Sequence, residues 1–482
     1  MAELLVPMSP LWWAARLHKK LECQEEEVEF YDAYYRGDHP LPWLAPQARQ
    51  EFRRILLMTR SNYMGLVCDA TAERLQIEGF RLSADAEGAD AETWRIWQAN
   101  NLDSDSDKGI LEGIIGGAWY TLTAPNPKDP STPFVWVEHA SQVTIEHEPG
   151  SNRRVRKAGW KEFKDDWTGE VHSSLWVDGF LHKFKASLRP GQSDEVLDWQ
   201  PRVVGKEQWP ARNPLDVVPL IEMPNNPRLL TGGVSELADL TDIQDRINKT
   251  IADRLVTQDY GSFPQKWATA WPEEDEHGNA LPAIDVGRNR MVTTDVKETR
   301  FGQWDAAPLD PYSAAKREDV KDVASRSRTP AQYLLGEMSN VNGETLKAAE
   351  SGLISKVEQR QRPLGEGAEE TVRLFRKAAG LPDMGGESME TIWRDPRFRT
   401  EGERTDSVVK KYQAGIISLR QAREDLGYSA TTIDRMEEQD AQAAQADPIF
   451  TATKSLMGGG QPPAVMPDAM MNGGQGAPAG NG

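Results

Sequence analysis

Cysteine is almost absent from this sequence. Only Cys23 and Cys68 occur in 482 residues, which is too few for a disulfide framework or a cysteine-rich zinc site. The seven histidines are not spaced as metal ligands with either cysteine; they stand at positions 18, 39, 139, 147, 172, 182 and 277. We therefore predict no metal site and no cofactor.

Long apolar runs are missing as well. No stretch of about 18 apolar residues occurs, which argues against a membrane-spanning helix and a membrane partner. The first residues, MAELLVPMSP, lack a basic flank before an apolar core, so they do not read as a secretory signal. Synthesis and assembly in a bacterial cytoplasm fit both observations.

An excess of positive charge is also lacking. The 56 Lys and Arg residues face 75 Asp and Glu residues, which gives a formal net charge of −19. A broad grip on nucleic acid needs clustered Lys and Arg to meet the phosphates, so we do not expect one. DNA that only passes by remains compatible, because a conduit should hold its cargo weakly.

Catalytic motifs are missing too. Neither a GxxxxGK[ST] phosphate loop nor HExxH nor G-x-S-x-G occurs. We predict a non-enzyme with no catalytic residues.

The alternating acids after position 102 suggest a calcium loop at first sight. The glycine needed at the sixth loop position is Lys108, however, and the bidentate glutamate position is Ile114. We expect Asp103 or Asp105 to be the N-cap of a helix over 109–115 instead.

The most informative stretch that is present runs from 213 to 271. An extended segment at 217–223 and a turn-rich run lead to a helical pattern, for which Ser235 is the expected N-cap. Apolar residues at spacings of three or four share one face; they are Leu237, Leu240, Ile243, Ile247 and Ile251. A helix over 235–260 would be roughly 39 Å long, with charged residues on its opposite face.

The chain before this stretch mixes helices and strands. We expect helices over 14–36, from about 46 to 75, and over 91–100. Strand patterns follow at 118–123, 134–138 and 142–146, with hairpins at 149–152, Gly169 and 178–179. Helices beside an antiparallel sheet make this an α+β region.

The basic run Arg153-Arg154-Val155-Arg156-Lys157 leaves one of these hairpins. We interpret it as a solvated edge strand, where charge discourages unwanted pairing, rather than as a DNA site.

The chain after the long helix alternates again. Short strand-like pieces surround an acidic loop at 272–279, and Asp310-Pro311 begins a helix that ends at the Thr329-Pro330 junction. Another long helix starts near Glu344, with a kink expected at Pro363. A helical region follows at 401–445, and the Gly-, Pro-, Ala- and Met-rich sequence beyond 447 predicts a disordered tail.

Several short motifs stand in a fixed order along the chain. They are V-V-P at 217–219, N-P-R-L at 226–229, G-V-S-E at 233–236, D-I-Q-D-R-I-N at 242–248, F-P-Q-K-W at 263–267, T-P-A-Q-Y-L at 329–334 and N-G-E-T-L-K-A-A-E at 342–350. In combination, this order resembles tailed-bacteriophage portal proteins, the head-to-tail connectors, of siphophage type.

The resemblance implies an α+β portal fold with a defined order of parts. These are a helix-rich wing with antiparallel strands at 1–212, an extended segment and first stem helix at 213–260, a small α/β clip at 261–309, a second stem helix at 310–328, a tunnel-loop region at 329–343, a long kinked helix returning to the wing at 344–399, a helical crown at 400–446 and a disordered tail at 447–482.

The resemblance also implies a function and partners. Portals form a ring, usually of twelve subunits, at one capsid vertex of the virion, through which DNA is packaged, retained and ejected without sequence specificity. The implied partners are further copies of the chain, the terminase large subunit, the head–tail adaptor protein, the major capsid protein, a scaffold protein and double-stranded DNA.

Two sets of site residues follow from the resemblance, beside the stem face given above. The expected tunnel loop facing the DNA is Glu337, Met338, Ser339, Asn340, Val341 and Asn342. The expected partner-binding clip loop is Glu273, Glu274, Asp275, Glu276 and His277. Alternatives are a metal-dependent nucleic-acid hydrolase and a minor internal capsid protein.

Overall fold

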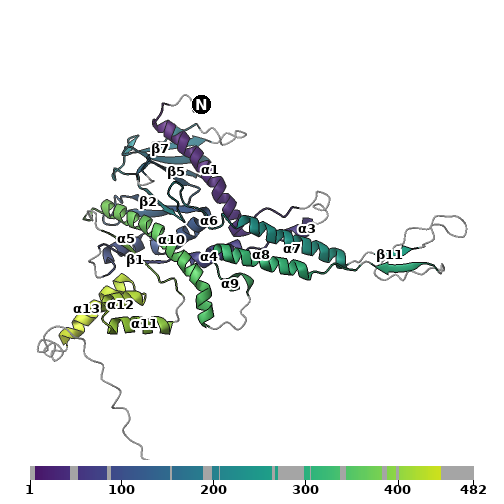
Figure 1. Cartoon of the computed structure of the whole chain (residues 1–482). Helices are drawn as coiled ribbons and strands as arrows, with labels where there is room; N and C mark the ends of the chain where they lie inside the picture. Colours follow the sequence, from purple (N-terminus) through teal and green to yellow (C-terminus); the bar gives the residue numbers. More distant parts are fainter. Residues whose placement is uncertain are drawn as a thin grey trace, which may run out of the picture.

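A two-helix arm projects from a mixed helical and stranded body (Figure 1). The computed structural model describes residues 6–43, 53–83, 88–151, 155–187, 198–205, 207–262, 266–269, 298–303, 305–336, 343–382, 388–397 and 401–446. The fold is α+β, as the sequence predicts. None of the helices in these ranges combines the length and apolar character needed to cross a bilayer.

The arm consists of α7 (Thr241–Ser262) and α8 (Asp310–Ser327), which pack against each other. At its outer end, β11 (Lys266–Thr269) pairs with β12 (Arg300–Gln303) in antiparallel register. Figure 1 shows this strand pair farthest from the body, at the right. The sequence predicted a helix at 310–328, and the structure confirms it with Pro311 in its first turn.

A six-stranded antiparallel sheet forms the upper part of the body in Figure 1. Its strands are β4 (Val143–His147), β5 (Arg156–Lys164), β6 (Glu170–Val177), β7 (Phe180–Ser187), β8 (Gln200–Pro201) and β9 (Ala211–Arg212). Helix α1 (Pro10–Arg36), capped by the Ser9 hydroxyl, packs on β4, β5 and β6. Trp160 and Phe184 are fully buried in the core beneath it.

A smaller sheet links these strands to the helices. It contains β10 (Leu220–Pro224), β2 (Ala118–Ala124) and β3 (Phe134–Glu138) in that order. Helices α6 (Leu102–Gly116) and α10 (Gly343–Ala378) pack on β2. Residues on the opposite face of the small sheet, such as Leu220, share a core with Trp176 of the large one.

The remaining elements complete the body. They are α3 (Arg53–Leu57), α4 (Met64–Ala72), β1 (Ile77–Arg81), α5 (Ala91–Ala99), α9 (Ala331–Leu335), β13 (Glu390–Trp393), α11 (Glu401–Gln413), α12 (Leu419–Asp425) and α13 (Ala430–Ala446). Strand β1 pairs with β13, although more than 300 residues separate them. The C-terminal helices lie at the opposite end of the molecule from the arm tip, where α13 contacts α5 (Figure 1).

Several sequence expectations are corrected by the structure. The described part of the helix expected over 46–75, from 53 onwards, contains two helices, α3 and α4, separated by non-helical residues 58–63. Helix α6 begins at Leu102, so Asp103 and Asp105 lie in its first turn, where acids favour the dipole, instead of capping it.

The described basic residues of the run at 153–157 are not on an edge strand. Its described members Arg156 and Lys157 lie on β5, which pairs with β4 and β6 on either side. Arg156 binds Glu370 of α10, and Lys157 lies 2.7 Å from Asp178. Arg156 and Lys157 therefore make contacts within the chain. Strand β13 was not predicted.

Candidate functional site at the base of the arm

The predicted stem face is buried. Leu237, Leu240, Ile243, Ile247 and Ile251 are at most 8 % exposed and belong to the central core. On the facing helix, Val320 and Val323 are buried in the same core. This is the seam by which the arm is joined to the body, as the apolar spacing predicts.

Helix α7 begins six residues later than predicted. The Ser235 hydroxyl accepts a hydrogen bond from the Leu237 N–H at 3.0 Å and closes a turn. The Glu236 N–H donates to the Ile114 carbonyl at 2.9 Å, which ties this turn to α6. Leu237 and Leu240 therefore reach the core from a turn, and regular helix starts at Thr241.

A buried ion cluster joins four segments at this point. The Glu236 carboxylate lies 3.3 Å from the Lys356 ammonium and 3.0 Å from the Arg360 guanidinium, and all three side chains are less than 10 % exposed. Lys356 also donates to the Ser327 carbonyl at the end of α8, at 2.8 Å. Arg360 donates to the Asn226 side chain, also at 2.8 Å. The cluster therefore ties the start of α7 and the end of α8 to α10.

One acid shared by two bases fixes the charge states in this cluster. Burial alone would raise the pKa of Glu236, but Lys356 and Arg360 outweigh it, so its pKa lies below the usual value. Burial lowers the pKa of Lys356 and exceeds the opposing effect of Glu236. The sequence indicated Glu236 only as the last residue of the G-V-S-E motif at 233–236. The i,i+4 spacing of Lys356 and Arg360 was the available signal for the pair.

A second polar network explains the D-I-Q-D-R-I-N motif. The Gln244 amide donates to the Ser61 carbonyl at 2.6 Å and accepts from the Tyr63 N–H at 3.2 Å. The Asn248 side-chain oxygen accepts from the Ser61 N–H at 3.0 Å, and both side chains are at most 1 % exposed. These bonds satisfy the backbone between α3 and α4, so the interrupted helix there is stabilised by α7.

Aromatic and ionisable groups extend this network to α1. The Tyr34 hydroxyl donates to Asp245 at 3.0 Å, and its ring stacks on His39. Burial raises the pKa of Asp245 and lowers the pKa of His39, and the His39 ring also contacts the Asn248 amide. Motif residues on α7 thus bind structural neighbours on two other segments.

The ends of the predicted tunnel loop are held by a third cluster. Tyr333, just before the loop, donates its hydroxyl proton to Glu350 of α10. The Arg74 guanidinium donates to the same hydroxyl at 3.0 Å. Glu337, Met338, Ser339, Asn340, Val341 and Asn342 lie outside the described residues.

Charged pairs also connect the two arm helices on their exposed side. Arg246 lies 2.8 Å from Asp319 and 2.7 Å from Asp322. The predicted clip residues beyond the arm, Glu273, Glu274, Asp275, Glu276 and His277, lie outside the described residues.

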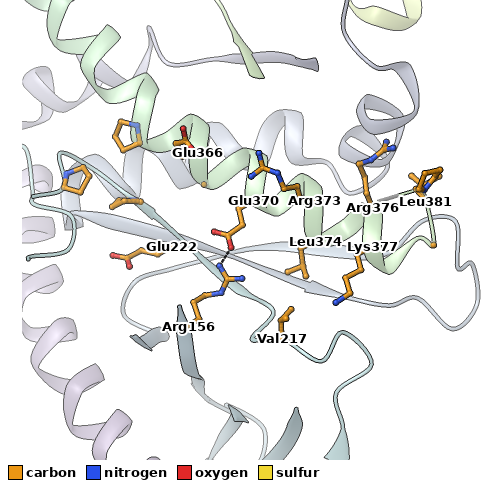
Figure 2. A pocket seen from close by; sticks show the side chains of 16 residues that line it. Arg156, Val217, Glu222, Glu366, Glu370, Arg373, Leu374, Arg376, Lys377 and Leu381 are labelled. Carbon is orange, nitrogen blue, oxygen red and sulfur yellow. Dashed lines mark hydrogen bonds and ion pairs between the residues drawn. The ribbon is translucent and has the colours of Figure 1, made fainter. Parts of the chain in front are cut away.

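A groove of about 1190 Å³ runs along the C-terminal half of α10. Figure 2 shows Glu370 pointing from the helix towards Arg156, with Lys377 and Leu374 on the same side. Each of its basic groups already has an intramolecular partner. Arg156 binds Glu370, Arg373 binds Glu369, Arg376 donates to Thr93, and Lys377 donates to the Leu215 carbonyl.

The described residues contain no group of three or more His, Cys, Asp and Glu side chains able to hold a metal ion. The buried polar groups at the arm base bind to each other and to backbone atoms. Their arrangement holds the projecting arm at a fixed angle to the body, which is a structural role.

Comparison with known proteins identifies a family that matches most of the chain. The family described as phage portal protein, SPP1 Gp6-like, matches residues 17–446. The portal protein of Mycobacterium phage L5 is 30 % identical over 440 residues, covering 86 % of this chain and 85 % of the relative. That of Mycobacterium phage D29 is 30 % identical over 411 residues, covering 80 % of each.

Among solved structures, a chain from the virion of a native gene transfer agent particle matches with a TM-score of 0.38 and 12 % identity. The match covers 80 % of this chain and 95 % of that one. The family assignment rests on the sequence matches, which span the body, the arm and the C-terminal helices. This chain therefore belongs to the phage portal protein family, SPP1 Gp6-like.

Proposed function

We propose that copies of this chain form a closed ring of twelve subunits at one capsid vertex. The ring is the conduit for genome packaging, DNA retention and ejection. Its partners are the terminase large subunit, the head–tail adaptor, the major capsid protein and a scaffold protein. In this proposal the chain performs no catalysis, and it assembles in the host cytoplasm.

One observation carries the proposal: a long arm is seated in the body by a buried ion cluster. An arm that only connected two parts of one chain would not need such a rigid base. In a ring, the arms of all subunits must project at one angle so that they form one wall, and a heterologous contact closes only if that angle is uniform.

The test is the assembly state of the purified full-length chain. Native mass measurement should give one closed oligomer, and negative-stain images should show rings with a central opening. A monomer or dimer across a wide concentration range contradicts the ring and favours the minor internal capsid protein. Magnesium-dependent cleavage of DNA by the purified chain, abolished by chelation, would favour the hydrolase.

We further propose the parts of the ring from the order of the chain. The wing comprises 1–212, the stem helices lie within 213–260 and 310–328, the clip is 261–309 and the crown is 400–446. Residues 329–343 hold the tunnel loop and 344–399 return to the wing. The acidic clip loop contacts terminase first and the adaptor later, and the loop at 337–342 meets the passing DNA.

A further inference from the structure

A histidine is fully buried beside the arm base. His39 is 0 % exposed and follows closely on Gly37, the residue that caps the end of α1. Its ring stacks on the Tyr34 ring, with the two centroids 5.1 Å apart. Its Nε2 atom faces the side-chain nitrogen of Asn248 on α7, and its Nδ1 atom has no hydrogen-bond partner among the described residues. A titratable group therefore lies in the contact between the arm and the segment that follows α1.

The orientation of the Asn248 amide is fixed by the groups that donate to it. Its Oδ1 atom accepts hydrogen bonds from the Ser61 N–H at 3.0 Å and from the Gln244 amide at 3.1 Å. A backbone N–H can only donate, so exchanging the amide oxygen and nitrogen of Asn248 would place two donors face to face at Ser61. The Asn248 NH2 group, which only donates, therefore points at His39.

This orientation selects one charge state of His39. The Nε2 atom has to accept a hydrogen bond from the Asn248 NH2 group, so the ring is neutral and carries its proton on Nδ1. Protonation of Nε2 would direct an N–H at that NH2 group. Two buried donors without an acceptor between them destabilise the contact, which therefore forms only with the uncharged ring.

The charged groups around His39 come from both sides of the contact. Burial has the largest effect and lowers the pKa of His39 from its ordinary value of 6.5. Asp245 on α7 and Asp38 beside the histidine act in the opposite direction, while Arg60 adds to the lowering. Tyr34 donates its hydroxyl proton to Asp245, and burial raises the pKa of that hydroxyl, so it stays neutral. The closed arm base thus keeps His39 uncharged at pH 7.

Asn248 joins three segments through this contact. Its oxygen binds the backbone at Ser61, between α3 and α4, and its nitrogen binds the segment after α1. Gln244, one helical turn earlier on α7, accepts from the Tyr63 N–H at 3.2 Å. A charged His39 cannot stay beside the Asn248 NH2 group while the Asn248 oxygen stays on Ser61, so at least one of these segments has to leave α7.

We propose that His39 is a pH-sensitive switch, which holds the arm base closed while its ring is neutral and opens it when the ring takes up a proton. In the closed state, the His39 Nε2 atom accepts from Asn248. In the open state, the segments at 37–43 and 58–63 separate from α7, and water reaches the charged ring. This inference goes beyond the proposed function and does not require the ring.

Hydrogen–deuterium exchange of the full-length chain tests the switch, with rates corrected for the intrinsic effect of pH on exchange. An open state in which His39 has its ordinary pKa of 6.5 becomes more populated by up to about tenfold when the pH falls from about 7.5 to about 5.5. Exchange of the backbone amides at 58–63 should therefore accelerate by up to about tenfold in the wild type, because the Ser61 and Tyr63 N–H groups lose their acceptors on α7.

Three variants separate the switch from other effects of acid. His39→Gln supplies an amide oxygen that accepts from Asn248 and does not titrate, so exchange at 58–63 should no longer depend on pH. Asn248→Asp still accepts from the Ser61 N–H but turns a carboxylate oxygen towards His39, so acid should slow exchange instead of accelerating it. His182→Gln is the matched control, because His182 is also buried with a pKa lowered by burial, but it lies on β7 of the large sheet. It should respond to acid as the wild type does.

A wild-type exchange rate at 58–63 that does not change with pH would overturn the proposal, as would an acid response that persists in His39→Gln. If His39→Gln fails to fold, Asn248→Asp decides, since acceleration by acid equal to that of the wild type would exclude the Asn248 contact as the switch. Loss of the response in His182→Gln would assign it to the large sheet. Each result is read from the single chain, so it is distinguishable from a failure to form rings.

Discussion

Glu236 and its two basic partners show at the residue scale how a buried charge can hold an arm in place. Two cations share one carboxylate, so the cluster carries one net positive charge. Removing the acid leaves two buried cations together, whereas removing Lys356 leaves one balanced pair. The two changes should therefore differ strongly, although each deletes one charged group.

We predict that Glu236→Gln lowers the free energy of unfolding by about 3–5 kcal/mol, the usual cost of an uncompensated buried charge. Lys356→Met should cost only about 1 kcal/mol, chiefly the lost hydrogen bond to the Ser327 carbonyl. Urea unfolding followed by tryptophan fluorescence measures both. Equal losses would contradict the charge balance described for the cluster.

The same carboxylate predicts a pH dependence. The pKa of Glu236 is lower in the folded chain than its ordinary value of 4.5, so the unfolded chain takes up the proton first as the pH falls. Its contribution is present above pH 4.5 and is lost as the pH drops through the folded pKa. The stability difference between wild type and Glu236→Gln should therefore shrink below pH 4.5 in unfolding curves recorded from pH 7 downwards. A stability difference that grows below pH 4.5 would contradict the lowered pKa of Glu236.

At the scale of elements, the contact between α6 and β2 depends on two glycines. A Cβ atom at Gly109 would lie 2.5 Å from the Trp119 ring, and one at Gly113 would also lie 2.5 Å from it. The buried Trp119 ring thus lies directly against the backbone of one helical turn. Only glycine permits this approach without displacement of the ring.

Gly109→Ala should destabilise the chain by about 1–3 kcal/mol through overpacking. Gly402→Ala is the control, because Gly402 lies in α11 with no atom within 4 Å of an added Cβ. Because Gly402 lies in the first turn of α11, the gain in helix propensity is small, and the free energy of unfolding should change by less than about 0.5 kcal/mol. Thermal unfolding of both variants gives the comparison, and destabilisation by Gly402→Ala would show that any substitution of a helical glycine is harmful.

Local pattern predicted the elements better than their ends. The spacing of Ile243, Ile247 and Ile251 identified the buried face of α7, because apolar periodicity depends on the helix alone. The predicted start of α7 was wrong, and the break between α3 and α4 was not predicted. The first depends on Ile114, and the second on Gln244 and Asn248, and no local propensity reports partners so far along the chain.

The sequence likewise indicated some residues of the candidate site and missed others. Motif order indicated the family and drew attention to Gln244 and Asn248, but their role as backbone acceptors and donors needed the structure. The Glu236 cluster was missed because its members lie on separate segments. The tunnel-loop and clip residues remain predictions, since they lie outside the described residues.

At the scale of the whole molecule, substitutions in the predicted clip loop should affect partner binding without affecting assembly of the ring. We predict that reversing Glu273, Glu274 and Glu276 to Lys leaves the ring intact but weakens binding of terminase and adaptor, because charge at a loop governs complementarity more than folding. Native mass measurement and pull-down with each purified partner test this. Disassembly of the ring, or unchanged binding of both partners, would contradict the clip assignment.

The tunnel-loop prediction also concerns the assembled particle. Met338→Glu combined with Asn340→Asp should spare the ring and reduce DNA packaging or retention, because added negative charge would repel the passing phosphates. The amount of full-length DNA per purified particle is the measurement. Wild-type filling would remove this loop from the DNA path.

The pairing of β1 with β13 has a consequence for synthesis. Ile77 of β1 cannot pair until Trp393 of β13 has been synthesised. At about 5–20 residues per second, a ribosome needs roughly 15–60 s to make the sequence between them. During that interval the free edge of β1 and the core beneath it have no permanent cover. Nascent chains are therefore open to capture by chaperones or proteases until about the first four-fifths of the sequence has been made, and a chain truncated before β13 cannot close its body.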